Sequence, residues 1–128
     1  MKEPLWLQDD VVTAIHSRQL AEHGGLDGVR DPGMLSSALA RPKNTFAYSL
    51  PKPDVPALAA AYAFGIIKNH PFVDGNKRTA YVLCRTFLIL NGQDINATDV
   101  DKYQTFLGVA DVTIDESQLA YWIRTRLA

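Results

Sequence analysis

The chain divides into apolar segments of helical length that are separated by short polar joints. In residues 9–22, apolar side chains recur at the three- and four-residue spacing of a helix face, which His16 and Gln19 interrupt. The two aspartates at the start of this segment are expected to cap a helix, and Gly24-Gly25 to end it. The pattern predicts a first helix that ends at about Glu22.

The next segment opens with Asp31-Pro32, a capping carboxylate followed by a proline at the first helical position. We expect this second helix to be short and to end near Ala40, because Pro42 follows. Residues 41–54 hold three prolines and two lysines, together with residues of strand character. They predict an exposed hairpin or flap.

Two strongly apolar segments follow. Residues 55–69, with Asp54 as their cap, are apolar on nearly every side, which is typical of a buried helix. A fourth helix of the same character is expected from Asn76 to Gly92. Capping residues predict a fifth helix after Thr98 and a sixth after Asp115. The pattern as a whole predicts an all-α domain of about six helices, with a short flap between the second and the third.

Composition agrees with one cytoplasmic domain and narrows the partners. The chain has 128 residues, of which 47% are hydrophobic and 21% charged, and its formal net charge is -1. No general basic field exists to attract nucleic acid, and no apolar run is long enough to span a membrane. The single cysteine, Cys84, fits a reducing compartment, and the amino terminus lacks the apolar core of a signal peptide.

The joint between the third and fourth helices, His70–Thr79, reads HPFVDGNKRT and concentrates polar chemistry. Pro71 ends the third helix, and Phe72 is expected to anchor the joint in the core. The amino end of the next helix, with Gly75 before it, offers free backbone N–H groups and a positive dipole, which suit an anion such as phosphate. Lys77 and Arg78 stand at this end, where cations disfavour an isolated helix but would bind phosphate.

Two further side chains of the joint complete a possible reaction centre. A histidine can exchange protons near neutral pH, so His70 is a candidate general base. Asp74 beside a polyphosphate is a candidate ligand for Mg²⁺. Together they indicate phosphoryl or nucleotidyl transfer. Taken singly, each residue also has an ordinary explanation: a helix-end histidine, an N-cap aspartate, and cations in a solvated first turn.

The joint resembles the signature of the Fic/Doc family, H-P-F-x-[DE]-G-N-[GK]-R, and residues 24–92 look like its Doc (death-on-curing) branch. The resemblance implies an all-helical fold and a reaction with ATP and Mg²⁺. It assigns His70 as the base, with Asp74 holding Mg²⁺ or orienting the target. Gly75, Asn76, Lys77 and Arg78 would bind the phosphates, and residues 43–53 would form a flap that aligns a target peptide.

Two departures from the AMP-transferring pattern decide which reaction is expected. That pattern has glycine in place of Lys77 and a second arginine in place of Tyr81. In Doc-like relatives the nucleotide is reversed and its γ-phosphate is transferred. The resemblance therefore implies a toxin of a toxin–antitoxin system, a protein kinase that phosphorylates a hydroxyl of translation elongation factor Tu and blocks translation. The alternatives are an AMP transferase and a non-catalytic phosphate-binding module.

The same resemblance bears on regulation. Many Fic proteins carry an inhibitory [ST]-x-x-x-E-[GN] helix in their own chain, and this sequence has no match to it. A separate antitoxin protein is therefore expected as a partner. Apolar residues near the amino terminus, among them Trp6 and Leu7, are candidates for its docking groove, although core packing also explains them.

Overall fold

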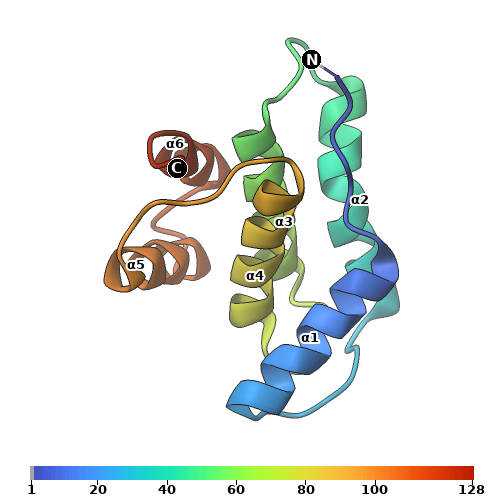
Figure 1. The fold of residues 1–128 in the computed structure, drawn as a ribbon. Helices are drawn as coiled ribbons and strands as arrows, with labels where there is room; N and C mark the ends of the chain where they lie inside the picture. The colour runs from blue at the N-terminus through green and yellow to red at the C-terminus, as the bar shows by residue number, and fades with distance from the viewer. Residues whose placement is uncertain (1) are drawn as a thin grey trace.

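The computed structural model describes residues 2–128, and within them it contains six helices and no strand (Figure 1). This confirms the all-α prediction. None of these helices is long and apolar enough to cross a membrane, as far as residues 2–128 show. The helices are α1 (Asp9–His23), α2 (Pro32–Tyr48), α3 (Val55–Asn69), α4 (Asn76–Leu90), α5 (Asp99–Ala110) and α6 (Glu116–Arg124).

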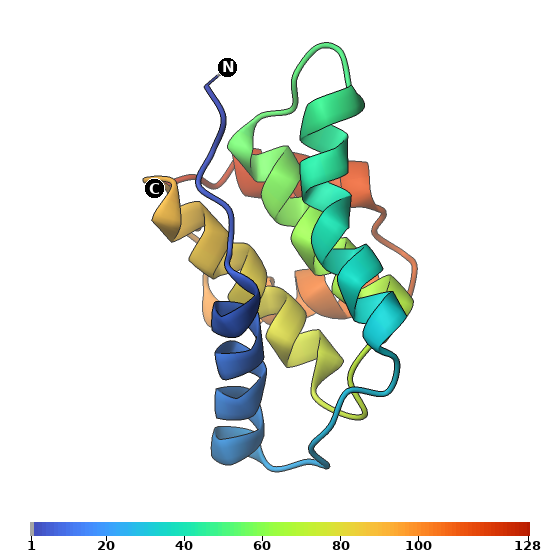
Figure 2. The ribbon, with the colours of Figure 1, turned by 90° about the vertical axis from the view of Figure 1, so that its right-hand side faces the viewer.

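Helix α3 forms the centre of the fold and packs against α2, α4 and α6 (Figures 1 and 2). Its middle is rich in alanine, and Leu58–Ala63 are at most 1% exposed. Gly65 lets α2 approach closely, since a Cβ there would lie 3.2 Å from the carbonyl oxygen of Ala38. Helix α1 packs across α4, and α5 lies beside α4 on its other side. The joint that follows α3 therefore starts from the most buried helix of the described chain.

The second helix is longer than the sequence predicts. Helix α2 continues through the buried Pro42 to Tyr48, so residues 43–48 are helical and only Ser49–Asp54 remain irregular. The prediction of an end near Ala40 was wrong, and so was the strand character expected within residues 43–48; the short flap between the second and third helices is confined to residues 49–54. A proline inside a helix costs about 3 kcal/mol, and the packing of α2 along α3 offsets that cost. Tertiary contact here outweighs local preference.

The buried face of α1 also differs from its apolar pattern. Its buried residues are Val12, His16 and Gln19, whereas Val11 is exposed. The helix starts after Gln8 without a side-chain cap, so its aspartates lie inside the first turn instead of capping it. The two polar interruptions of the stripe are therefore the side chains that face the rest of the protein.

The segment before α1 packs into the core. Leu7 is buried, and its N–H donates to the hydroxyl of Tyr62 over 3.2 Å. The Trp6 ring lies between Phe46 of α2 and Phe87 of α4, with ring centroids 5.9 Å from each. Trp6 and Leu7 thus serve core packing, and they also line a pocket together with Gln8, Asp9, Asp10 and Lys43.

Candidate active site

The joint between α3 and α4 begins with a strained histidine. His70 follows the last turn of α3 in the left-handed conformation (φ 50°, ψ 54°), and its N–H donates to Ile66 O over 3.0 Å. A residue other than glycine pays about 1–2 kcal/mol for this conformation. Pro71 prevents the helix from continuing. The backbone thus turns sharply at His70, whose side chain is left exposed.

A guanidinium from the α1–α2 linker holds this turn in place. Arg30 Nε donates to the carbonyl oxygen of His70 over 2.8 Å, and Arg30 Nη2 donates to that of Asn69 over 2.9 Å. These carbonyls stand at the negative end of α3, where a cation is favourable. Arg30 therefore neutralises the helix end and fixes the backbone that carries the candidate base.

The same linker pairs with the joint through its backbone. Val29 and Phe72 form an isolated antiparallel bridge, in which Arg30 N–H donates to Pro71 O (2.7 Å) and Val73 N–H donates to Gly28 O (3.0 Å). The linker lies more than forty residues away in the sequence, so the joint is held by long-range contacts. It is a braced loop rather than a free turn.

Inside the protein, Phe72 anchors the joint as predicted, with 1% of its surface exposed. The ring of His16 stacks on Phe72 with centroids 3.7 Å apart, and its Nε2 lies 2.8 Å from the carbonyl oxygen of Asp74. A carbonyl oxygen only accepts, so this ring nitrogen carries the proton. The Asn76 side chain accepts from Phe72 N–H (3.0 Å) and donates to Phe72 O (2.9 Å).

The Asp74 carboxylate is held by the backbone and stays exposed. Its Oδ1 accepts from Gly75 N–H over 3.0 Å, and its Oδ2 accepts from Leu26 N–H over 3.3 Å. Each oxygen keeps further lone pairs for a cation. Residues 2–128 contain no group of three histidines, cysteines or carboxylates that could hold a metal by themselves. A single carboxylate fits Mg²⁺ only if phosphate oxygens and water supply the other ligands.

The amino end of α4 is open. Gly75 precedes it with φ 77°, and the first helical bond runs from Thr79 N–H to Gly75 O. No side chain of residues 2–128 caps this end, so the N–H groups of Asn76, Lys77 and Arg78 lack the acceptors that a cap supplies. Free N–H groups and the helix dipole together attract an anion.

The two cations of this first turn are exposed and unpaired. Within the described part of the chain, neither Lys77 nor Arg78 makes a hydrogen bond or an ion pair. Other arginines of the protein have carboxylate partners: Arg41–Glu116, Arg85–Asp94, Arg124–Asp54 and Arg126–Asp101. Unpaired cations at a positive helix end are unfavourable without a ligand.

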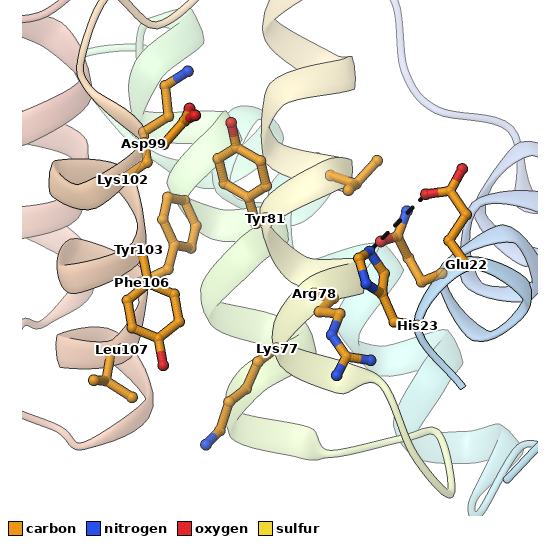
Figure 3. A pocket seen from close by; sticks show the side chains of 12 residues that line it. Glu22, His23, Lys77, Arg78, Tyr81, Asp99, Lys102, Tyr103, Phe106 and Leu107 are labelled. Carbon is orange, nitrogen blue, oxygen red and sulfur yellow. Dashed lines mark ion pairs between the residues drawn. The ribbon is translucent and has the colours of Figure 1, made fainter. Parts of the chain in front are cut away.

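Lys77 and Arg78 open onto a cleft of about 560 Å³ between α1, α4 and α5 (Figure 3). This volume suits a small ligand. Figure 3 shows the side chains of α5 facing those of α4 across the cleft. The lining residues are Gln19, Glu22, His23, Lys77, Arg78, Tyr81, Val82, Asp99, Lys102, Tyr103, Phe106 and Leu107.

A family model described as the Fic/DOC family matches residues 6–88, well over half of the chain. The chain belongs to the Fic/DOC family. "Toxin Doc" of Mycolicibacterium smegmatis is 39% identical over 101 residues, which cover 78% of this chain and 75% of that protein. "Protein kinase doc" of Escherichia phage P1 is 30% identical over 89 residues, which cover 70% of each chain. Both relatives are Doc proteins, so the resemblance to that branch is confirmed.

The Fic/DOC signature is thus held in one braced joint, but its residues do not all face the same space. Lys77 and Arg78 line the cleft, whereas His70, Asp74, Gly75 and Asn76 do not. Asn76 is 4% exposed, and its side chain is already engaged by the backbone of Phe72. Its contact with an anion would therefore come from its backbone N–H.

Sequence reasoning missed three residues that build this site. His16 and Gln19 looked like interruptions of an apolar stripe, although their spacing with Val12 is that of one helix face. That spacing is the signal that could have found them. Arg30 gave no local signal, because its partners lie about forty residues further along the chain.

Proposed function

We propose that this protein is a toxin-type protein kinase. It transfers the γ-phosphate of ATP to a hydroxyl group of a translation factor similar to elongation factor Tu, and it thereby blocks translation in the cytoplasm. A separate antitoxin protein would hold it inactive. The observation that carries the proposal is the open, cationic amino end of α4 at the head of a cleft. The names of the two relatives, one a toxin and one a protein kinase, point the same way.

The residues of the joint divide the work between binding and proton transfer. The N–H groups at the start of α4, after Gly75 and including that of Asn76, would bind phosphate oxygens together with the side chains of Lys77 and Arg78. Arg78 would also offset the charge that develops on the transferred group. The cleft beyond them would take the rest of the nucleotide.

His70 would act as the general base. The hydroxyl oxygen of the target attacks the γ-phosphorus, and His70 accepts the hydroxyl proton. A new bond forms between this oxygen and phosphorus, while the bond from phosphorus to the bridging oxygen breaks and ADP leaves. Arg30 keeps His70 at the turn from which it would meet the target.

Asp74 would supply the one protein carboxylate to Mg²⁺, or orient the target. When bound, the ion neutralises charge on the phosphate oxygens. The carboxylate is preset for this by its bonds to the N–H groups of Gly75 and Leu26. These bonds leave its remaining lone pairs free.

Kinase activity is favoured over AMP transfer by the residue that replaces the second arginine. Tyr81 packs edge-on against Phe106 of α5, with ring centroids 5.0 Å apart and planes at 85°. An aromatic side chain held in this way adds no further cation beside Lys77 and Arg78 on α4. The phosphate contacts then stay with the first turn of α4, where the transferred group would sit.

The test is transfer of label from ATP to protein in bacterial cell extract. We expect label from γ-phosphate-labelled ATP, and none from α-phosphate-labelled ATP, on a protein that mass spectrometry identifies as the elongation factor. His70→Ala should lower the rate about 10²–10⁴-fold, with helicity unchanged because His70 is exposed. Transfer of the α-label would show an AMP transferase. No transfer of either label, with ATP still bound, would show a binding module.

A further inference from the structure

Among the polar side chains of the cleft that the proposed reaction does not use, one is almost completely buried. Gln19 of α1 lines the cleft and is only 8% exposed. Within residues 2–128 its side chain makes no hydrogen bond. Its amide atoms keep contact with solvent in the cleft. In the described chain, the fully enclosed polar side-chain atoms without a partner are Thr79 Oγ1, Gln93 Oε1 and Trp122 Nε1. Gln19 therefore places an unpartnered carboxamide at the wall of the cleft.

A largely buried amide that has no protein partner keeps only the hydrogen bonds that water or a ligand in the cleft can offer. An apolar side chain of similar size would pack at this position without needing them. Gln19 lies one helical turn after His16, which holds the signature joint through the carbonyl of Asp74. The amide thus belongs to the same face of α1 that shapes the site.

The other cleft residues indicate what the amide would meet. Lys77 and Arg78 offer positive charge at one end, and Tyr103 and Phe106 offer aromatic surface on α5 (Figure 3). Glu22 pairs with Arg18, and its other carboxylate oxygen lies 4.0 Å from His23 Nε2. Positive charge, aromatic surface and a carboxamide together match the phosphates, the ring faces and the polar edge of a nucleotide.

We propose that Gln19 determines base specificity by binding the polar edge of adenine in this cleft. A glutamine side chain carries a donor and an acceptor side by side, and adenine presents the complementary N7 acceptor and N6 amino donor. Guanine presents two acceptors at this edge, so it would leave the glutamine oxygen unpaired. This inference rests on the proposed function in that it takes the ligand to be a nucleotide.

The experiment measures binding by calorimetry of three ligands with Mg²⁺: a non-hydrolysable ATP analogue, the matching GTP analogue, and inorganic tripolyphosphate. The proteins are the wild type, Gln19→Leu and Gln104→Leu. Leucine keeps a similar volume and a similar helix propensity. Gln104 is an exposed residue of α5 that does not line the cleft, so its variant is the matched control. Thermal unfolding checks that each variant is folded.

We expect the wild type and Gln104→Leu to prefer the ATP analogue over the GTP analogue. Gln19→Leu should bind the ATP analogue roughly tenfold more weakly, lose the preference, and bind tripolyphosphate as the wild type does. Unchanged preference in Gln19→Leu would overturn the inference and leave the proposed function intact. An equal loss for tripolyphosphate would also overturn it, because Gln19 would then contact phosphate. Failure of the wild type to bind any of the three would overturn the proposed function itself.

Discussion

At the amino end of α3, the Asp54 carboxylate accepts from Ala57 N–H over 3.0 Å and pairs with both Arg124 Nε and Arg124 Nη2. At the amino end of α4, in the described chain, no side chain caps the helix, and Lys77 and Arg78 have no partner. The two helices pack together at the centre of the protein. They have similar lengths, so the difference does not come from the helices themselves.

The contrast extends to three other helices. Asp31, Thr98 and Asp115 cap α2, α5 and α6, and Asp115 forms a full capping box with Gln118. These ends follow the rules for helix stability. The end of α4 breaks two of them, since it lacks a cap and carries cations at the positive pole. Such local conflicts are expected where a protein binds a ligand.

Reversing the charges at the open end should produce the largest effect. In a Lys77→Glu and Arg78→Glu double variant, we expect binding of tripolyphosphate to fall roughly a hundredfold or more, because two charge-assisted contacts are lost. Stability should rise by about 0.3–1 kcal/mol, since acids favour a helix start. Calorimetry and urea unfolding measure the two effects. Weaker binding together with lower stability would contradict this prediction, because it would mean that the substitutions damage the fold.

Removing the cap of α3 should lower the stability of the protein and leave the binding of tripolyphosphate unchanged. Asp54→Ala is expected to lower the free energy of unfolding by about 1 kcal/mol for the cap, and the half-exposed ion pair with Arg124 adds little to that. Binding of tripolyphosphate should not change, because Asp54 does not line the cleft. Urea unfolding and calorimetry test this. An Asp54→Asn variant, which keeps a capping oxygen, should recover most of the lost stability.

The pH dependence should give the smallest effect, and it should come from ion-paired carboxylates, among them the Asp54 cap of α3. The guanidinium of Arg124 lowers the pKa of Asp54, and that of Arg85 lowers the pKa of Asp94. The folded state therefore binds these protons less readily than the unfolded chain. Their stabilisation is complete above the unfolded pKa of about 4 and is lost as the pH falls through the lower folded values.

We expect urea unfolding to give a constant free energy between about pH 5 and 7 and a decline below about pH 4. Arg124→Gln should make this decline shallower, because it removes the partner that lowers the pKa of Asp54. The effect of this one partly exposed pair should amount to a few tenths of a kcal/mol. An unchanged decline in Arg124→Gln would mean that other carboxylates control the acid transition.

The sequence by itself determined the number of helices and most of their starts. Asp31, Asp54, Thr98 and Asp115 were predicted as caps, and each accepts the expected backbone N–H. Capping is local chemistry, since a side chain and an N–H three residues later decide it. The joint was found for the same reason: Pro71 and Gly75 mark a break in any context.

Only the tertiary structure decided what surrounds the joint and how far α2 runs. Pro42 predicts an end, but α2 packs along α3 and continues through the buried Pro42 to Tyr48. Arg30 meets its carbonyl partners only because the linker folds back onto the joint. The cleft exists because α1 and α5 flank the start of α4. These features depend on residues far apart in the chain, and the physical rules that act between neighbours in sequence do not specify such contacts.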